Sequence, residues 1–408
     1  MIHKIKIATR QFSFCLLIVM AVGLTLLRLF LLSVDDYKTT IESKIFELTE
    51  IPLDIGTLQA NMRGFNPGII LKDIRVFPTG SHEQQSIKLK EIRFSINLLD
   101  LIWTQQLLPS SWLTLVGAEI TVIRQEDGSL LIKGLNPTDS KQPFWLLSGG
   151  RYEVLNSDIT WIDKQRHAKP LKFKNIDVLL KNEVSSENHE IHLLSKLPKT
   201  MGESLRISMS IQGNVFKKDN INGVIYIKGT QVQLAEIFTG EKPAGVKIAA
   251  GKGDFELWSQ WEKSKNVAIT GNIQATNIRL KKTNQTYNVD RLETSFNGLN
   301  NESGWQFGVT DFKAKEGDKT WPTANFIFSG NQQLTKIAAS IGQLDLQQFS
   351  QLMQFFSPLD KENQDLLTKL ALKGQLKDFS AYINTEQKTF AVNGSVKNIH
   401  SHSFANTP

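Results

Sequence analysis

The sequence predicts a mainly β protein with a few helices. After residue 52 the chain consists largely of short runs rich in Ile, Val, Leu, Phe and Thr, separated by turn signals such as Gly64-Phe65-Asn66-Pro67-Gly68. Apolar and polar residues alternate within these runs, so that each strand has one apolar and one polar face. Roughly twenty strands at spacings of ~8–15 residues are expected, which is typical of antiparallel meanders.

Composition bounds the class of protein. The chain has 408 residues, of which 40% are hydrophobic and 21% charged, so a packed structure is expected. Its single cysteine excludes an intramolecular disulfide and cysteine-rich metal sites. The net charge is +7, and four of the positive charges precede the first acid, Asp35. The remaining charge is too small to indicate nucleic acid as a partner.

The first part of the chain predicts a membrane anchor. Residues 12–34 contain one charge, Arg28, and at ~1.5 Å per residue they are long enough to cross a ~30 Å hydrocarbon core. A cleaved signal peptide is the alternative, but no small-x-small cleavage site precedes Asp35. Basic residues before the apolar run and acids after it predict a cytoplasmic N-terminus, with the bulk of the chain across the membrane.

A few helices are expected among the strands. Residues 37–49 have the period of a short amphipathic helix, which Pro52 ends. Shorter helices are expected at 98–106 and 232–238, and a helical hairpin at 345–371. The expected parts are a cytoplasmic tail (1–11), a transmembrane helix (12–34), a β/helix module (35–136) and an extended β region that contains the hairpin (137–408).

The strands leave an apolar face without enough helices to cover it. Ile269 and Ile273, for example, share a face, whereas Thr270 and Asn272 share the other. Two arrangements remain open: two sheets pack as a sandwich, or one sheet curls into a trough whose apolar lining holds another molecule.

Short phrases recur in the sequence at irregular spacing, as weak internal repetition. They are Leu71-Lys72-Asp73-Ile74-Arg75-Val76, Leu89-Lys90-Glu91-Ile92-Arg93-Phe94, Phe173-Lys174-Asn175-Ile176-Asp177-Val178, Ala275-Thr276-Asn277-Ile278-Arg279-Leu280 and Val289-Asp290-Arg291-Leu292-Glu293-Thr294. Each combines a small polar turn or bulge with a strand. Within 153–162, Val154 and Ile159 can likewise share a face only if a bulge separates them.

Several segments resemble the AsmA superfamily, and most closely its YhdP type. They are Val34-Asp35-Asp36-Tyr37, Ile51-Pro52-Leu53-Asp54-Ile55-Gly56, Gly64 to Val76, Gly117-Ala118-Glu119-Ile120 and Asn156 to Asp163. The resemblance covers most of the chain, in the same order, after a membrane anchor. Because YhdP-type proteins are several-fold longer, we expect the chain to correspond to their N-terminal part.

The resemblance implies a fold, a location and a function. It implies a single-pass protein of the bacterial inner membrane that projects into the periplasm. There it forms an elongated, twisted antiparallel sheet curled into a hydrophobic groove, as in bridge-type lipid transfer proteins. Phospholipids would be the ligands, moved passively between the inner and outer membranes. The alternative is a periplasmic scaffold or outer-membrane assembly factor that docks envelope proteins without conducting lipid.

Alternation nominates the residues that would line the groove. They are Ile87, Leu89, Phe94, Ile96, Leu113, Leu115, Ile120, Val122, Trp161, Val178, Ile269, Ile273, Phe296 and Phe307. No catalytic constellation is found, and the acids are scattered without a candidate pair. We therefore expect no enzyme, no cofactor and no metal site.

Overall fold

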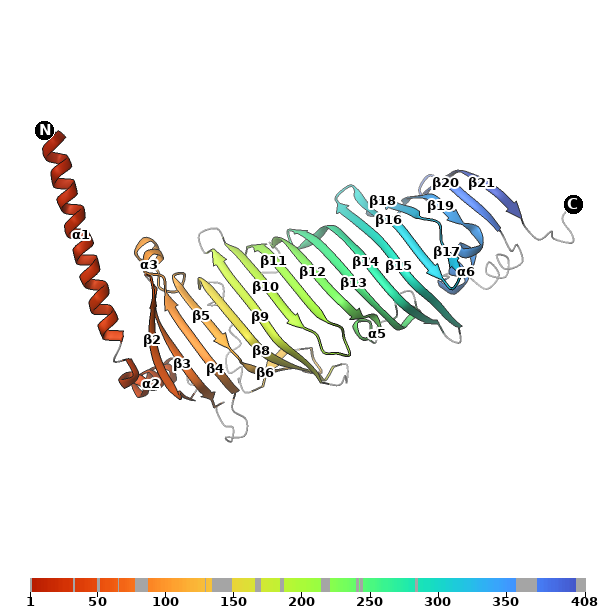
Figure 1. Ribbon diagram of the computed structural model, residues 1–408. Helices are drawn as coiled ribbons and strands as arrows, with labels where there is room; N and C mark the ends of the chain where they lie inside the picture. The colour runs from red at the N-terminus through yellow and green to blue at the C-terminus, as the bar shows by residue number, and fades with distance from the viewer. Residues whose placement is uncertain are drawn as a thin grey trace, which may run out of the picture. The chain divides into compact units, whose positions relative to one another are not determined.

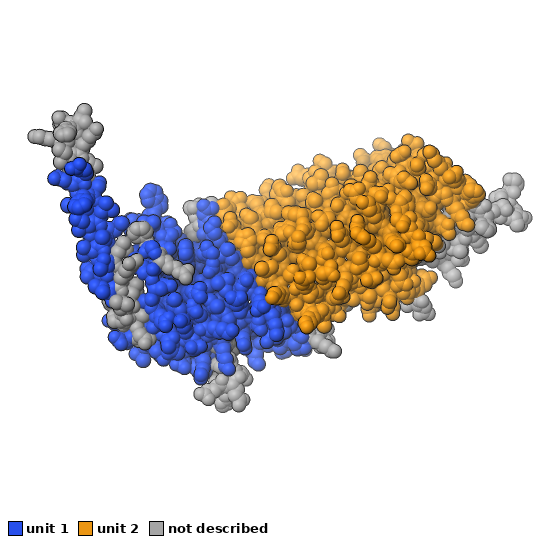
Figure 2. Space-filling model, in the orientation of Figure 1, with its two compact units in different colours: residues 1–187 blue, residues 188–408 orange. Residues whose placement is uncertain are grey.

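The protein is described from a computed structural model. It describes residues 2–31, 34–49, 52–64, 66–77, 87–128, 130–133, 149–165, 170–183, 187–213, 221–239, 242, 245–282, 285–356 and 373–400. The chain divides into two compact units, residues 1–187 and 188–408 (Figure 2). The boundary expected after residue 136 lies inside unit 1 and stays a prediction.

The described residues are mainly strand, with few helices, which confirms the predicted class (Figure 1). The helices are α1 (Ile2–Leu31), the 3₁₀ helix η1 (Val34–Tyr37), α2 (Lys38–Thr49), α3 (Leu98–Thr104), α5 (Leu234–Ile237) and α6 (Leu346–Phe356). The strands of unit 1 are β1 (Leu53–Asp54), β2 (Thr57–Arg63), β3 (Asn66–Val76), β4 (Ile87–Ile96), β5 (Ser111–Val116), β6 (Glu119–Arg124), β7 (Leu130–Ile132), β8 (Arg151–Asp163) and β9 (Leu171–Glu183). Those of unit 2 are β10 (Asn188–Lys196), β11 (Ser204–Gln212), β12 (Asn222–Gln233), β13 (Lys247–Glu262), β14 (Lys265–Lys282), β15 (Gln285–Asn301), β16 (Gly304–Glu316), β17 (Lys319–Thr320), β18 (Ala324–Gly330), β19 (Lys336–Asp345), β20 (Lys373–Asn384) and β21 (Thr389–His400).

The apolar N-terminal segment is helical. Helix α1 includes most of the expected transmembrane segment 12–34, and it begins ten residues earlier, at Ile2. Within the described residues, no helix meets the combined length and apolarity required of a membrane span. Membrane crossing by residues 12–34 therefore stays a prediction.

The shorter helices lie near their expected positions. Helix α2 matches 37–49, α3 matches 98–106, and α5 forms a single turn within 232–238. Helix α6 is the first arm of the expected hairpin at 345–371, and Asp345 caps it by accepting the Gln348 N–H at 2.9 Å. The second arm lies outside the described residues.

Unit 1 contains a small closed core. Ile55, Leu58, Leu71 and Ile74 are 0–4% exposed and contact one another. Ile41 of α2 packs against them, and Glu42 Oε1 accepts the Ile55 N–H at 2.8 Å. Helix α2 thus covers this end of the unit 1 sheet.

The predicted antiparallel pairing holds for most strand pairs of unit 1, with two exceptions. Strands β5 and β6 both pair in parallel with β8. The apolar run 112–124 forms two strands, β5 and β6, which are separated at Gly117, whose φ of 64° is the left-handed conformation that glycine tolerates. Strand β7 turns back antiparallel to β6, so the chain reverses once more before it enters β8.

Unit 2 is an antiparallel meander. Each strand from β10 to β16 pairs with the next, β16 pairs with both the short β17 and β18, and β18 to β21 again pair in sequence. Figure 1 shows these strands side by side in chain order.

The recurrent phrases have a structural counterpart. Asp73, Asn175 and Asn277 have φ values of 51–54°, the left-handed region that Asn and Asp enter more readily than most residues. The phrases with Glu91 and Arg291 at this position contain no such residue. Instead, Leu89–Phe94 pairs with the Asp73 phrase, and Val289–Thr294 with the Asn277 phrase.

The left-handed residue shifts which side chains of a strand share a face. Leu71 and Ile74 are three residues apart and yet belong to one buried cluster, and Leu89 and Ile92 of the paired strand both pack against it. The expected bulge in β8 is also confirmed: Asn156 has a φ of 47°, and the register shifts between Val154 and Ser157. Its N–H donates to Asp177 Oδ1 of β9 at 2.8 Å.

Candidate functional site

An uninterrupted row of apolar residues crosses ten strands of unit 2. Residues that pair directly in neighbouring strands lie on the same face of a sheet. The successive pairings join Leu193, Ile207, Ile227, Leu257, Gly271, Phe296, Val309, Phe326, Ile341 and Phe379. We call this set the first apolar row; it contains no polar side chain.

A second apolar row runs beside the first on the same face, two residues away along each strand. It joins Ile191, Met209, Ile225, Ser259, Ile269, Gly298, Phe307, Phe328, Ala339, Ala381 and Val392. Ser259 is its one polar member, and its hydroxyl oxygen accepts from Trp261 Nε1 at 2.8 Å and from Asn266 Nδ2 at 2.7 Å.

The large side chains of these rows are not enclosed. Every leucine, isoleucine, valine, methionine and phenylalanine of both rows is half-buried or exposed, and Phe307 and Phe328 are 38% and 37% exposed. A second layer packed over the face would bury such side chains almost completely. Among the described residues the rows therefore form an accessible apolar surface rather than a closed core.

Most residues on the opposite face of β10 to β16 are polar, although this face also includes Tyr226 and Trp258. One of its rows joins Leu194, Arg206, Lys228, Glu256, Asn272, Ser295 and Thr310. Lys228 Nζ donates to Glu256 Oε1 at 2.5 Å, and this hydrogen bond, with the carboxylate charge, raises the pKa of Lys228. From β10 to β16 the two faces thus differ in composition.

Aromatic rings and glycines fit together within the apolar rows. The rings of Phe296 and Phe307 stack with centroids 6.2 Å apart. A Cβ on Gly271 would lie 2.7 Å from the Phe296 ring, and one on Gly298 would lie 2.7 Å from the Ile269 side chain. Both glycines therefore leave room for a neighbouring large side chain to lie over the sheet.

A third row on this face is largely buried. It joins Val232, Gly253, Ala275, Leu292 and Ala314. Val232, Ala275 and Ala314 are at most 7% exposed, and a bulge or left-handed residue adjoins the row at Gln231, Gly251 and Asn277. Because bulges bend strands, we interpret this buried row as a bend of the sheet.

Helices α5 and α6 lie near this bend. Helix α5 contacts β12 and β13, and α6 contacts β19 and β20. Phe355 of α6 packs against Tyr287 with ring centroids 5.6 Å apart, and the Tyr287 hydroxyl donates to Glu316 Oε2 at 2.8 Å. Burial, followed by this hydrogen bond and the carboxylate charge, raises the pKa of Tyr287. The helices thus cover one margin of the apolar face and leave the two apolar rows accessible.

The four nominated residues of unit 2 lie on the same apolar face. Phe296 belongs to the first row and Ile269 and Phe307 to the second, and Ile273 follows Gly271 on the same side of β14. All four side chains are half-buried or exposed.

The nominated residues of unit 1 divide into three groups. Two apolar rows cross β2 to β9: Ala60, Ile69, Phe94, Leu113, Tyr152 and Leu180, and beside them Leu58, Leu71, Ile92, Leu115, Val154 and Val178. These rows contain Phe94, Leu113, Leu115 and Val178, and Ile96 follows Phe94 on the same side of β4. Val122 pairs with Trp161, and Ile120 with Ile159, so Ile120, Val122 and Trp161 also share a face. The third group is Leu89, which packs against the closed core, and Ile87, whose backbone pairs with Val76.

Sequence reasoning missed most members of the unit 2 rows, among them Leu193, Ile207, Ile227, Leu257, Val309, Phe326, Ile341 and Phe379. Alternation within each strand carried the signal. Which apolar residues line up across neighbouring strands depends on the register between the strands, and alternation within one strand does not reveal that register.

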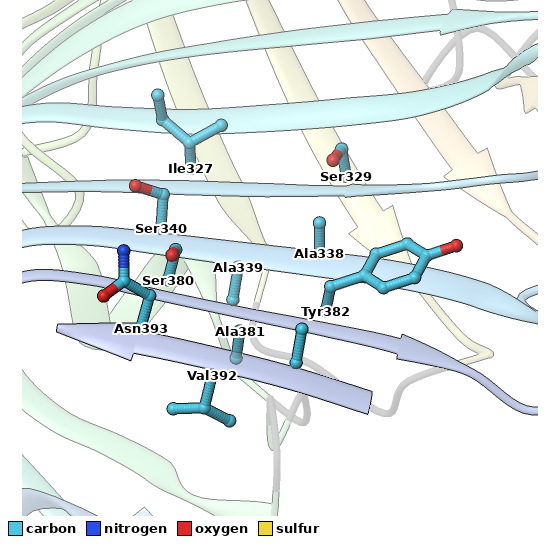
Figure 3. A pocket seen from close by; sticks show the side chains of 11 residues that line it. Ile327, Ser329, Ala338, Ala339, Ser340, Ser380, Ala381, Tyr382, Val392 and Asn393 are labelled. Atoms are coloured by element: carbon cyan, nitrogen blue, oxygen red, sulfur yellow. The ribbon is translucent and has the colours of Figure 1, made fainter. Parts of the chain in front are cut away.

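A shallow hollow of about 270 Å³ lies at β18 to β21 (Figure 3). Ser329, Ala338, Ser340, Ser380 and Tyr382 line it, and they alternate with members of the apolar rows. Figure 3 shows Ala338 and Ala339 extending from opposite sides of β19. Ala339, Ala381 and Val392 of the second apolar row line it as well, so the hollow adjoins that row. Among the described residues, no group of three or more His, Cys, Asp or Glu is placed to hold a metal ion.

No curated protein and no solved structure matches the chain. The model of the YhdP protein family matches residues 1–408. This match confirms the resemblance drawn from the short motifs. The chain belongs to the YhdP family.

Proposed function

We propose that the apolar rows bind phospholipid acyl chains and that the protein moves phospholipids between the inner and outer membranes of the bacterial envelope. The observation that carries this proposal is the first apolar row, which crosses ten strands without a polar side chain. At ~4.8 Å between strands, such a row extends for about 45 Å within unit 2.

Transfer from water to such a face favours acyl chains by ~0.8 kcal/mol per buried CH₂. Because the row repeats similar side chains strand after strand, neighbouring positions have similar affinity and an acyl chain meets no large barrier between them. The bend at the buried row would deepen the face into a groove, while head groups stay in water. This mechanism is passive and needs no catalytic residue and no cofactor.

The proposal includes anchoring of the chain in the inner membrane by residues 12–34, with the N-terminus in the cytoplasm. The apolar side chains of α1 support it: Phe12, Leu17 and Val19, among others, are more than half exposed.

The test is native mass spectrometry with lipid analysis of the full chain. The variant Ile269→Asp/Ile273→Asp places two carboxylates on the apolar face, and Thr270→Asp/Asn272→Asp places the same charges on the polar face of the same strand. We expect phospholipid to co-purify with the wild type and the polar-face variant, and to be lost from the apolar-face variant. Folded wild-type protein without lipid would contradict the proposal and favour a scaffold that docks envelope proteins.

A further inference from the structure

An exposed apolar cluster lies at α3 and in the loop that follows it. Ile102 and Trp103 are 74% and 90% exposed, and Leu99, Leu107 and Leu108 are each more than half exposed. We call these five residues the α3 knob. Exposed clusters of this kind mark contact sites for proteins or membranes.

The α3 knob is held in an ordered conformation. The Asn97 side chain caps α3 by accepting the N–H groups of Leu99 and Asp100 at 3.1 and 3.3 Å. Beyond the helix, Ser110 Oγ donates to the Gln106 carbonyl at 2.8 Å and Ser111 Oγ to the Leu108 carbonyl at 2.7 Å. The apolar side chains therefore lie on an ordered loop, so binding of a partner costs little conformational entropy.

A pocket lined by two arginines and one acid, Glu153, adjoins the α3 knob. Ser95 at the end of β4 pairs with Trp112 at the start of β5, and Trp112 pairs with Arg151 at the start of β8. Together with Arg93 they line a pocket of about 250 Å³. Residues 97–110, which contain the knob, connect the two strands at this same edge of the sheet.

The arginines of the pocket keep donors available. Arg93 bonds Glu91 through Nε, and Arg151 bonds Glu153 through Nε and Nη2, at 2.8 and 2.5 Å. Among the described residues, the Nη groups of Arg93 and Nη1 of Arg151 have no hydrogen-bond acceptor, and Arg151 lies 5.6 Å from the Trp112 ring centroid. Guanidinium groups of this kind suit phosphate oxygens.

We propose that the α3 knob inserts into the surface of a lipid bilayer and that Arg93 and Arg151 meet the phosphates of its head groups. A tryptophan beside aliphatic side chains suits the membrane–water interface, where its ring is apolar and its N–H is polar. The adjacent phosphate donors favour a bilayer over a protein surface. Only 21 residues lie between the end of α1 at Leu31 and the start of β1 at Leu53, so an anchored α1 keeps unit 1 close to the membrane. For the membrane anchoring of α1, the inference rests on the proposed function.

The test uses the full chain in vesicles of phosphatidylethanolamine and phosphatidylglycerol. Cys15→Ser removes the native thiol, and Ile102→Cys introduces a site for an environment-sensitive fluorophore. The matched control is Lys174→Cys, an exposed position in β9 of the same unit. We expect the probe at position 102 to shift to shorter wavelength and to be quenched about twofold by nitroxide-labelled acyl chains, whereas the probe at 174 stays unchanged.

A probe at position 102 that behaves like the one at 174 would overturn the inference. Adding Arg93→Gln and Arg151→Gln should reduce the quenching at position 102; unchanged quenching would overturn the role of the two arginines. Lipid that co-purifies with the protein before it is placed in the vesicles reports on the apolar rows. Lipid-free protein with a quenched probe therefore refutes the proposed function alone, and lipid-loaded protein with an unquenched probe refutes the α3 knob alone.

Discussion

Two apolar regions of this molecule consist of the same residue types and differ in what covers them. In unit 1, Ile55, Leu58, Leu71 and Ile74 form a closed core beneath α2, with at most 4% of each side chain exposed. In unit 2, the two apolar rows contain similar side chains, and none of the large ones is enclosed. Apolar alternation therefore predicts a face, whereas the neighbouring helix decides whether that face is a core or an accessible surface.

The largest expected effect is the difference in the free energy of unfolding between two side-chain truncations, one in each apolar region. Ile74→Ala removes a buried side chain and should lower the free energy of unfolding of unit 1 by about 2–5 kcal/mol. Ile269→Ala removes a half-buried one and should cost unit 2 about 1 kcal/mol or less. Denaturant titration followed by hydrogen exchange at β3 and β14 measures each unit separately. Equal losses at the two sites would show that the apolar rows are also enclosed.

A smaller effect concerns the left-handed residues that shift the alternation. Asn277 has a φ of 52°, and alanine at this position should cost about 1–2 kcal/mol because its Cβ is disfavoured there. Asn277→Gly is the control and should be close to neutral. Urea midpoints of the two variants compare them. If both variants are equally stable, backbone conformation is not what selects asparagine in this phrase.

The smallest effect is at the margin where α6 meets the sheet. Tyr287→Phe removes the hydrogen bond to Glu316 and should cost about 1 kcal/mol at neutral pH. Because the pKa of Tyr287 is raised in the folded protein, the neutral side chain stabilises the fold below the ordinary tyrosine pKa near 10. This stabilisation is lost as the pH rises through the pKa of Tyr287 in the folded state. The stability difference between wild type and Tyr287→Phe should therefore shrink in alkaline urea titrations. A difference that grows with pH would contradict the assigned direction.

Much of the fold follows from local patterns. The strands and the four short helices, α2, α3, α5 and α6, form near the positions that period and Pro or Gly signals indicate. The bulge in β8 follows from the spacing of Val154 and Ile159. The parallel pairing of β5 and β6 with β8 does not follow from local patterns, because it depends on a reversal of the chain rather than on the composition of the strands.

The candidate site was less accessible to sequence reasoning. Ile269, Ile273, Phe296 and Phe307 share the apolar face of unit 2, because strict alternation holds along that part of the strands. Leu89 was nominated for the groove and packs against the closed core, because the paired phrases at Asp73 change the phase of alternation. The complete rows required the register of ten strands for the first and eleven for the second, which is a property of the folded sheet.

The most direct test of the central claim is photo-crosslinking of the full chain in its membrane. A photoreactive phenylalanine analogue replaces Phe296 in the first apolar row or, as the control, Asn297, its exposed neighbour on the polar face. The account predicts phospholipid adducts from position 296 and few or none from 297. Equal lipid labelling at both positions, or protein adducts alone from position 296, would contradict a lipid-binding apolar face.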